Sequence, residues 1–182
     1  MRTLVILGLL GGTARAGELD LDLGAQATTT AWHGDHGGGA TLDLGYWFRP
    51  WLGASFVSKE QYATVDDRFM SYFSVNVSAR TRIQGFRLTG ELGGVHQHEE
   101  PRAAVMEQPV QSLFGVGDGI RHRMGARAAF EIAYPIHSYQ HGELYAGFQI
   151  DATLFMDTDR GPQWMTSAGL SLGFSYDFAR GP

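Results

Sequence analysis

The sequence predicts an all-β chain that folds as an eight-stranded antiparallel up-and-down transmembrane β-barrel. Three observations predict this fold: eight segments of alternating apolar and polar residues, connections that alternate in length, and charges confined to one face of the strands. The 182 residues leave room for one domain with a closed barrel. The chain has 25 glycines and no cysteine, so it offers neither a disulfide framework nor thiol chemistry.

The N-terminal residues have the form of a secretory signal peptide. Arg2 precedes the apolar stretch 4–10, and small residues then lead to Ala14-Arg15-Ala16, an A-x-A cleavage pattern. We therefore expect an exported chain. A formal net charge of −5 argues against a nucleic-acid partner. The expected organisation is a signal peptide, a barrel and a short periplasmic tail, at residues 1–16, 17–178 and 179–182 respectively.

Each predicted strand is a run in which every second residue is apolar, the period of a β-strand. Near the C-terminus Leu170 and Leu172 alternate with Ser171 and Gly173, and the segments 39–48, 68–82 and 143–156 alternate in the same way. No segment shows a sustained helical period. The eight strands are expected at about 18–32, 39–48, 51–62, 68–82, 85–96, 119–134, 143–156 and 164–178.

The connections between these strands alternate in length. Tight turns are expected at Arg49-Pro50 and Ile83-Gln84, whereas longer loops follow the odd-numbered strands, the longest at about 97–118. A medium connection, Pro135–Gly142, joins the sixth and seventh strands. Short periplasmic turns and longer outer loops are typical of outer-membrane barrels, in which an even strand number places both chain ends in the periplasm.

The charged residues of the strands fall on the face opposite the apolar one. Lipid outside the barrel explains the uncharged face, because a charge there costs about 2–4 kcal/mol at the bilayer midplane. A narrow lumen explains the balance of acids and bases, because charges removed from water need partners. Parity assigns to the inner face the acids Asp20, Asp22, Asp43, Glu91, Glu131, Asp151 and Asp177 and the bases Lys59, Arg80, Arg82, Arg87, Arg121, Arg123 and Arg127.

A soluble β-sandwich or a lipocalin-like barrel is the alternative, with the apolar face in a core. Such a fold needs no balance of charge and would show lysines outside. Aromatic residues at the strand ends favour the membrane barrel, since amphipathic rings collect at both membrane interfaces. These residues are Trp32, Tyr62, Phe69 and Trp164 on the loop side, and Phe48, Trp51, Tyr134, Tyr176 and Phe178 on the turn side.

Together these features resemble the small eight-stranded outer-membrane barrels of the OmpA/OmpX type. In that family the closing strand, with alternate apolar and aromatic residues that end in Phe, is read by the barrel-assembly machinery. The matching residues here are Leu170, Leu172, Phe174, Tyr176 and Phe178. The resemblance implies a cell outer membrane location, contact with outer-membrane lipids and lipopolysaccharide, and a monomer. Residues 179–182 depart from the family, whose chains usually end at the aromatic residue.

The densest group of metal-ligating residues lies at the loop end of the fifth strand. His96 and His98 share a strand face, and with Glu99 they could hold a divalent metal. Imidazole and carboxylate suit zinc, copper or nickel. The alternative is a polar loop mouth without a metal. His33, Asp35, His36 and His122 lie on the same side by topology. No organic cofactor is expected.

An outer-membrane enzyme is a second possibility. His137-Ser138 is similar to the His-Ser pair of lipid A deacylases of the PagL type, but topology places it on the periplasmic side and the surrounding motif is missing. A palmitoyl-transferase-like or omptin-like enzyme would need His, Asp or Ser at the outer rim, where 32–36 offers a His and an Asp. The sequence therefore assigns no catalytic residue.

The function expected from these observations is a structural or surface-interaction role, with a lumen closed by a salt-bridge network. Eight strands leave little interior space, and paired charges would fill it. An enzyme that acts on lipid A, whether deacylase-like or acyltransferase-like, and a narrow channel are the alternatives. The outer loops carry more acids than bases, and the loop 97–118 is apolar enough to cover the mouth or meet a partner.

Overall fold

The computed structural model describes residues 17–31, 33–113, 120–157 and 161–178. Within them eight strands form one closed antiparallel barrel, in which each strand pairs with its sequence neighbours and the first pairs with the last. The predicted fold class is confirmed. The strands are β1 (Glu18–Thr30), β2 (His36–Arg49), β3 (Leu52–Ala63), β4 (Arg68–Ile83), β5 (Phe86–Pro101), β6 (Arg121–Tyr139), β7 (Gly142–Phe155) and β8 (Trp164–Asp177). The predicted signal peptide, the predicted tail and Trp32 lie outside the described residues.

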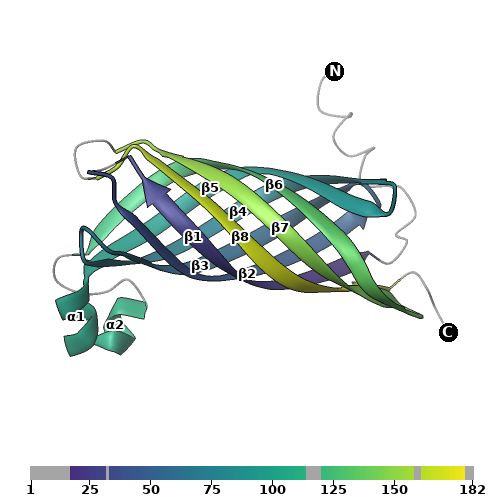
Figure 1. Ribbon diagram of the computed structural model, residues 1–182, viewed down its shortest axis with the longest axis horizontal. Coiled ribbons are helices and arrows are strands. Elements are labelled where there is room, and N and C mark those ends of the chain that lie inside the picture. Colours follow the sequence, from purple (N-terminus) through teal and green to yellow (C-terminus); the bar gives the residue numbers. More distant parts are fainter. Residues whose placement is uncertain (1–16, 32, 114–119, 158–160, 179–182) are drawn as a thin grey trace, which may run out of the picture.

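The barrel has a turn end and a loop end. β1 begins and β8 ends at the turn end, where Glu18 is paired with Asp177. The loop end carries the longer connections, including the β5–β6 connection with two short helices, α1 (Arg102–Glu107) and α2 (Pro109–Leu113). Figure 1 shows tilted strands and both helices beyond the loop end. Among the described residues, no helix is long and apolar enough to cross a membrane.

The turn between β4 and β5 is a two-residue hairpin turn. Gln84 and Gly85 both have positive φ, at 51° and 88°. This is the backbone conformation of a type I′ turn, whose twist matches that of the flanking strands and which glycine adopts without strain. The tight turn predicted near Ile83-Gln84 is therefore present, displaced by one residue.

The predicted connection Pro135–Gly142 is wrong, because β6 continues through it. Strand pairing runs on to Tyr139 opposite Gly142, and only Gln140 and His141 form the turn. The register shifts between Pro135 and His137. Proline has no N–H to donate to a ladder, but Pro135 still lies opposite Tyr145, and Ile136 is the extra residue of the bulge, so the strand continues past the proline.

The two faces of the barrel wall differ in the way that the alternation predicts. On the outer face Leu92 and Leu170 are 69% exposed and Val75 is 67% exposed. On the inner face Lys59 and Arg123 have no exposed surface. The buried core of this protein is thus the lumen, and its apolar surface is the outside of the barrel. This is the arrangement of a small barrel in lipid.

Aromatic rings pair on the wall near both ends of the barrel. Tyr62 and Phe69 lie near the loop end with ring centroids 5.2 Å apart. At the turn end Tyr176 and Phe178 lie 4.9 Å apart, and both are exposed. Amphipathic rings at these two levels mark the membrane–water interfaces of a barrel.

Candidate functional site

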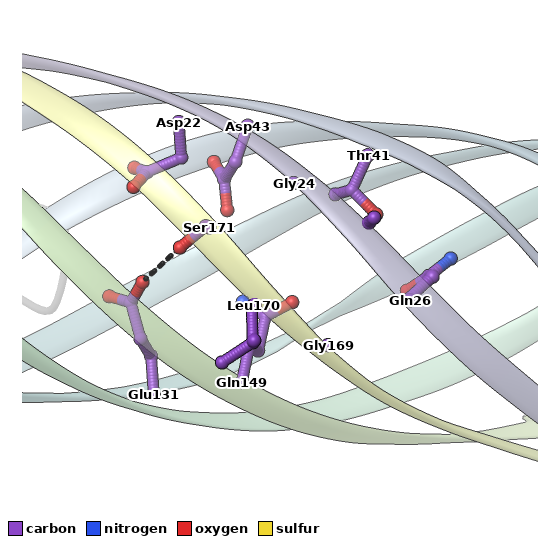
Figure 2. A pocket seen from close by; sticks show the side chains of 11 residues that line it. Asp22, Gly24, Gln26, Thr41, Asp43, Glu131, Gln149, Gly169, Leu170 and Ser171 are labelled. Atoms are coloured by element: carbon purple, nitrogen blue, oxygen red, sulfur yellow. Dashed lines mark hydrogen bonds between the residues drawn. The ribbon is translucent and has the colours of Figure 1, made fainter.

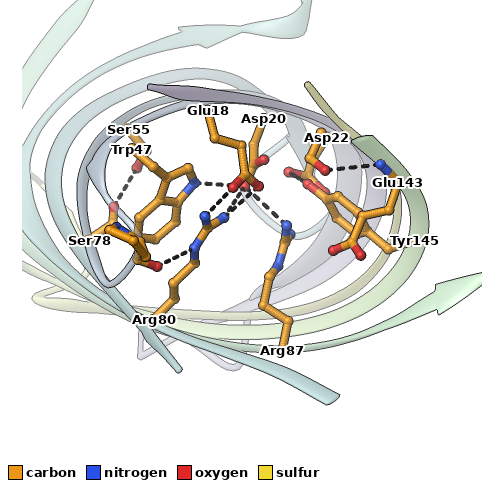
Figure 3. A network of polar contacts seen from close by, with 12 residues as sticks. Glu18, Asp20, Asp22, Trp47, Ser55, Ser78, Arg80, Arg87, Glu143 and Tyr145 are labelled. Carbon is orange, nitrogen blue, oxygen red and sulfur yellow. Dashed lines mark hydrogen bonds and ion pairs between the residues drawn. The ribbon is translucent and has the colours of Figure 1, made fainter. Parts of the chain in front are cut away.

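The lumen at the turn end is filled by a cluster of charged side chains. The Asp20 carboxylate accepts hydrogen bonds from Trp47 Nε1 at 2.7 Å and from Arg87 Nη1 at 3.1 Å. Arg80 is paired with Glu18, and its Nη1 lies 3.5 Å from Asp20 Oδ2. Figure 3 shows both arginines directed at the Glu18 and Asp20 carboxylates across the interior. Because β1 is separated from β4 and β5 in the wall, these pairs bridge the lumen.

Aromatic rings hold the two arginines in place. The Arg80 guanidinium carbon lies 4.1 Å from the centroid of the Trp47 ring, and that of Arg87 lies 3.6 Å from the Tyr145 ring. The Tyr145 hydroxyl donates a hydrogen bond to Asp22 at 2.7 Å. A cation over an aromatic face is stabilised most when it is desolvated, as these buried guanidiniums are.

The middle of the barrel holds a second group of ion pairs. Lys59 Nζ donates to Asp151 Oδ2 at 2.5 Å, and Arg127 Nη1 donates to Glu91 Oε2 at 2.6 Å. Arg127 Nε lies 3.9 Å from Asp151, which joins the two pairs. All four side chains are at most 6% exposed. Such burial is tolerable only because each charge has an opposite charge within bonding distance.

An apolar layer that the sequence analysis missed lies between these pairs and the loop end. It consists of inward-facing side chains that contact one another in the lumen. Tyr72 belongs to it and brings a polar contact, its hydroxyl 3.0 Å from Thr153 Oγ1. The sequence signal was present, since Met70, Tyr72 and Phe155 fall on the otherwise polar side of the alternation. The members are Ala63, Met70, Tyr72, Val95, Phe155 and Met165.

Arg123 is buried in the lumen above the apolar layer. It donates to Glu99 Oε1 at 3.1 Å, and its other terminal nitrogen donates to the carbonyl oxygens of Asp157 at 2.8 Å and Pro162 at 2.6 Å. The guanidinium carbon lies 4.1 Å from the centroid of the Phe155 ring. One buried side chain therefore ties the β7–β8 connection to the barrel interior.

The lumen retains a small polar cavity between the turn-end and middle groups. Its volume is about 30 Å³, and Asp22, Asp43, Glu131 and Gln149 contribute to its lining. Ser171 lies on β8, two strands from Glu131 on β6, and donates to Glu131 at 3.5 Å, as Figure 2 shows. A space of this size holds about one or two water molecules. The pocket lies among the polar side chains that line the lumen.

The predicted metal group is split by the barrel wall. His96 and His98 lie on the outer face of β5, as their spacing predicted. Glu99 points into the lumen, where it is bound by Arg123 and lies 3.8 Å from Arg121. Adjacent residues of a strand face opposite sides, so the carboxylate cannot join the imidazoles without breaking the strand. This part of the predicted ligand set needs correction.

His122 takes the place of Glu99 beside the two imidazoles. It lies on β6 directly opposite His98 in the strand register. A potential metal-binding atom of each of His96, His98 and His122 lies within 4.8 Å of those of the other two. His122 lies at the loop end, as the topology predicted, but its place in the cluster depends on the register between β5 and β6, which alternation along a strand does not encode.

The remaining chemical candidates occupy separate positions. His137 and Ser138 lie near the end of β6 at the turn end, away from the outer loops, where the His137 ring packs against Tyr139. Asp35 is buried at the loop end and accepts hydrogen bonds from the backbone N–H groups of His36 and Val65, both at 2.8 Å. Its carboxylate thus fastens the β1–β2 connection to the β3–β4 connection.

Solved structures of small outer-membrane barrels share this architecture. Neisserial surface protein A is 12% identical, with a TM-score of 0.57 over 89% of this chain and 97% of its own. The N-terminal barrel domain of Pseudomonas aeruginosa OprF is 15% identical, with a TM-score of 0.56 over 88% and 100%. Yersinia pestis Ail, in complex with the heparin analogue sucrose octasulfate, is 16% identical, with a TM-score of 0.54 over 88% and 99%. Neither a protein-family model nor a curated protein matches the chain.

The closed fold and the apolar outer surface both indicate that this protein spans a membrane. A closed barrel leaves no strand edge unpaired, so its backbone can cross lipid. Its outer wall is apolar and its charges are inside, the reverse of a water-soluble barrel. The chain is a small eight-stranded β-barrel of the outer membrane.

Proposed function

We propose that the protein acts through its outer surface, in a structural or surface-interaction role, and that its lumen is closed. The main support for a closed lumen is the ion pair Lys59–Asp151, which joins β3 to β7 across the interior with 2.5 Å between Nζ and Oδ2. β3 and β7 lie on opposite sides of an eight-stranded wall, so this pair occupies the path that a solute would have to take.

The other layers support closure at several depths. The turn end is bridged by Arg80 and Arg87, and the loop end is covered by Arg123. Between them lies the apolar layer, in which the Tyr72 hydroxyl is the polar group among the side chains of the cluster. Moving an ion through this interior would require several buried pairs to separate, and a buried charge that loses its partner costs about 3–5 kcal/mol.

The β5–β6 connection supports a role at the outer surface. Met106 on α1 is 74% exposed and Val110 on α2 is 69% exposed. Both helices stand beyond the loop end, outside the lipid-facing wall (Figure 1). Large apolar side chains presented to water on a projecting segment are typical of a contact surface. We therefore assign the surface contacts to this segment.

The partners that follow from this proposal are those of an integral barrel. Outer-membrane lipids and lipopolysaccharide would cover the apolar wall, and the barrel-assembly machinery would read the closing strand that ends at Phe178. The protein would be exported by the segment 1–16 and act as a monomer. No cofactor enters this function.

Planar-bilayer recording tests the closed lumen. Protein refolded into detergent and added to a lipid bilayer should insert without producing discrete conductance steps. Steps of uniform size that scale with the number of inserted molecules would overturn the proposal in favour of a narrow channel.

The contact role is tested with a variant in which Met106 and Val110 are changed to Ser. It should insert normally, but once in a supported bilayer it should capture lipopolysaccharide vesicles added on the loop side less than the wild type does; equal capture in surface plasmon resonance would contradict that role.

A further inference from the structure

Three histidines form a cluster on the outside of the barrel near its loop end. His96 and His98 alternate along β5, and His122 lies opposite His98 on β6. His98 is also opposite Ser71 on β4, one pleat from the aromatic pair Tyr62–Phe69 that marks the interface. The cluster therefore sits where the apolar wall meets the outer aqueous phase, and His122 is exposed there.

The imidazole nitrogens converge on one point. His96 Nε2 lies 2.6 Å from His98 Nε2 and 3.5 Å from His122 Nδ1. The ring centroids are 4.5 Å, 4.6 Å and 5.5 Å apart, so all three rings belong to one group. Two nitrogens of a tetrahedral zinc site are about 3.3 Å apart, given bonds of about 2.0 Å. The 3.5 Å separation already fits this value, and the 2.6 Å separation needs only a small rotation of one ring.

Two neighbours orient the rings. The sulfur of Met124 lies 2.9 Å from His96 Nδ1. A thioether only accepts hydrogen bonds, so this contact favours the tautomer with the proton on Nδ1 and a free lone pair on Nε2. Phe73 packs edge-on against His98, with ring centroids 6.1 Å apart. Metal-binding histidines commonly donate the N–H of their second ring nitrogen to an acceptor, the position that the Met124 sulfur occupies beside His96.

His98 joins the cluster through Nε2, and its second ring nitrogen lies apart from this contact. Its Nδ1 atom is buried and has no hydrogen-bond partner among the described residues. A buried polar atom without a partner is unfavourable, and natural proteins keep few of them without a functional reason. The other nitrogen, His98 Nε2, is directed at His96 Nε2. A metal ion between the two rings would replace this contact with one bond to each nitrogen.

From this geometry we propose that His96, His98 and His122 bind a divalent transition-metal ion, of the zinc or copper class, at the outer rim. Three neutral imidazoles are a ligand set that these ions favour over magnesium or calcium. The cluster can be reached from outside the barrel, because His122 is exposed. The site is separate from the closed lumen, since the barrel wall lies between His98 and Glu99.

The test is metal titration of the full barrel in detergent micelles, purified without a histidine tag. Calorimetry with Zn²⁺ and visible absorption with Co²⁺ should both show one ion per chain. His96→Ala, His98→Ala and His122→Ala should each weaken binding at least tenfold, because the loss of an outer-shell partner alone costs about 10–100-fold. Met124→Leu removes the sulfur but keeps the volume, and it should weaken binding by a smaller factor.

His36→Ala is the matched control, because His36 also lies at the loop end but outside the cluster. It should leave the stoichiometry and affinity unchanged. Heat-modifiable gel migration verifies that every variant is folded, so loss of binding is separated from loss of the barrel. The proposal is overturned if folded wild-type protein binds no ion, or if His36→Ala weakens binding as much as the cluster variants do.

Discussion

Lys59 and Asp151 are joined by an ion pair that crosses the barrel from β3 to β7, with 2.5 Å between Nζ and Oδ2. Lys59 is the only lysine in the chain, and it has no exposed surface. A lysine removed from water in this way is compensated by its carboxylate, and both residues depend on the pair.

Removal of one partner should therefore harm the barrel more than removal of both. We expect Lys59→Met to lower the free energy of unfolding by about 3–5 kcal/mol, because it leaves a buried carboxylate without its main partner. The double variant Lys59→Met with Asp151→Leu should recover most of this loss. Urea unfolding from lipid vesicles measures both. A double variant less stable than the single one would contradict this account of the pair.

The apolar wall predicts a position-dependent penalty for charge. Leu92→Arg places a cation on the outer face of β5 within the apolar wall and should destabilise the folded barrel by about 2–4 kcal/mol. Ile83→Arg is its control, since Ile83 is also exposed but lies at the turn end, where the penalty is about 0–1 kcal/mol. The same vesicle unfolding assay compares them. Equal penalties would mean that the wall does not face lipid in the way described.

Gly173 illustrates how tightly the lumen is filled. A Cβ atom there would lie 2.1 Å from both the Tyr145 ring and Asp22 Oδ1. Gly173→Ala should therefore displace the Tyr145–Asp22 hydrogen bond and destabilise the barrel by about 1–3 kcal/mol. At Gly94, on the outer face, an added Cβ meets no atom within 4 Å, so Gly94→Ala should be nearly neutral. Thermal unfolding of both variants in micelles tests the contrast, and a neutral Gly173→Ala would show that the lumen has spare room.

The sequence was sufficient for the architecture because a strand in a small membrane barrel obeys a simple rule. With lipid on one side and a lumen on the other, alternation assigns a side to each residue of a strand. It correctly placed Lys59 of β3 and Glu91 of β5 on the inner face, where both are buried. The same rule separates Glu99 from His96 and His98, so the misplaced carboxylate could have been recognised by parity alone.

Other features depend on pairing between strands, which alternation does not encode. The approach of His122 to His98 follows from the register of β5 and β6. The continuation of β6 beyond Pro135 follows from a bulge that only the ladder with β7 reveals. The apolar layer around Tyr72 and Phe155 was visible as exceptions on the polar face, but its position in the lumen depends on the tilt and stagger of the strands.

The closed lumen is tested most directly by solute entry into vesicles that carry the barrel. Wild-type protein should leave the permeability of the vesicles to a small sugar at the level of protein-free lipid. A variant with Glu91→Ala, Arg127→Ala, Lys59→Ala and Asp151→Ala removes the middle ion pairs together and, if it remains folded, should stay near the same level, because the turn-end pairs, the apolar layer and Arg123 are retained. Wild-type vesicles that admit the sugar well above the lipid background would contradict the account.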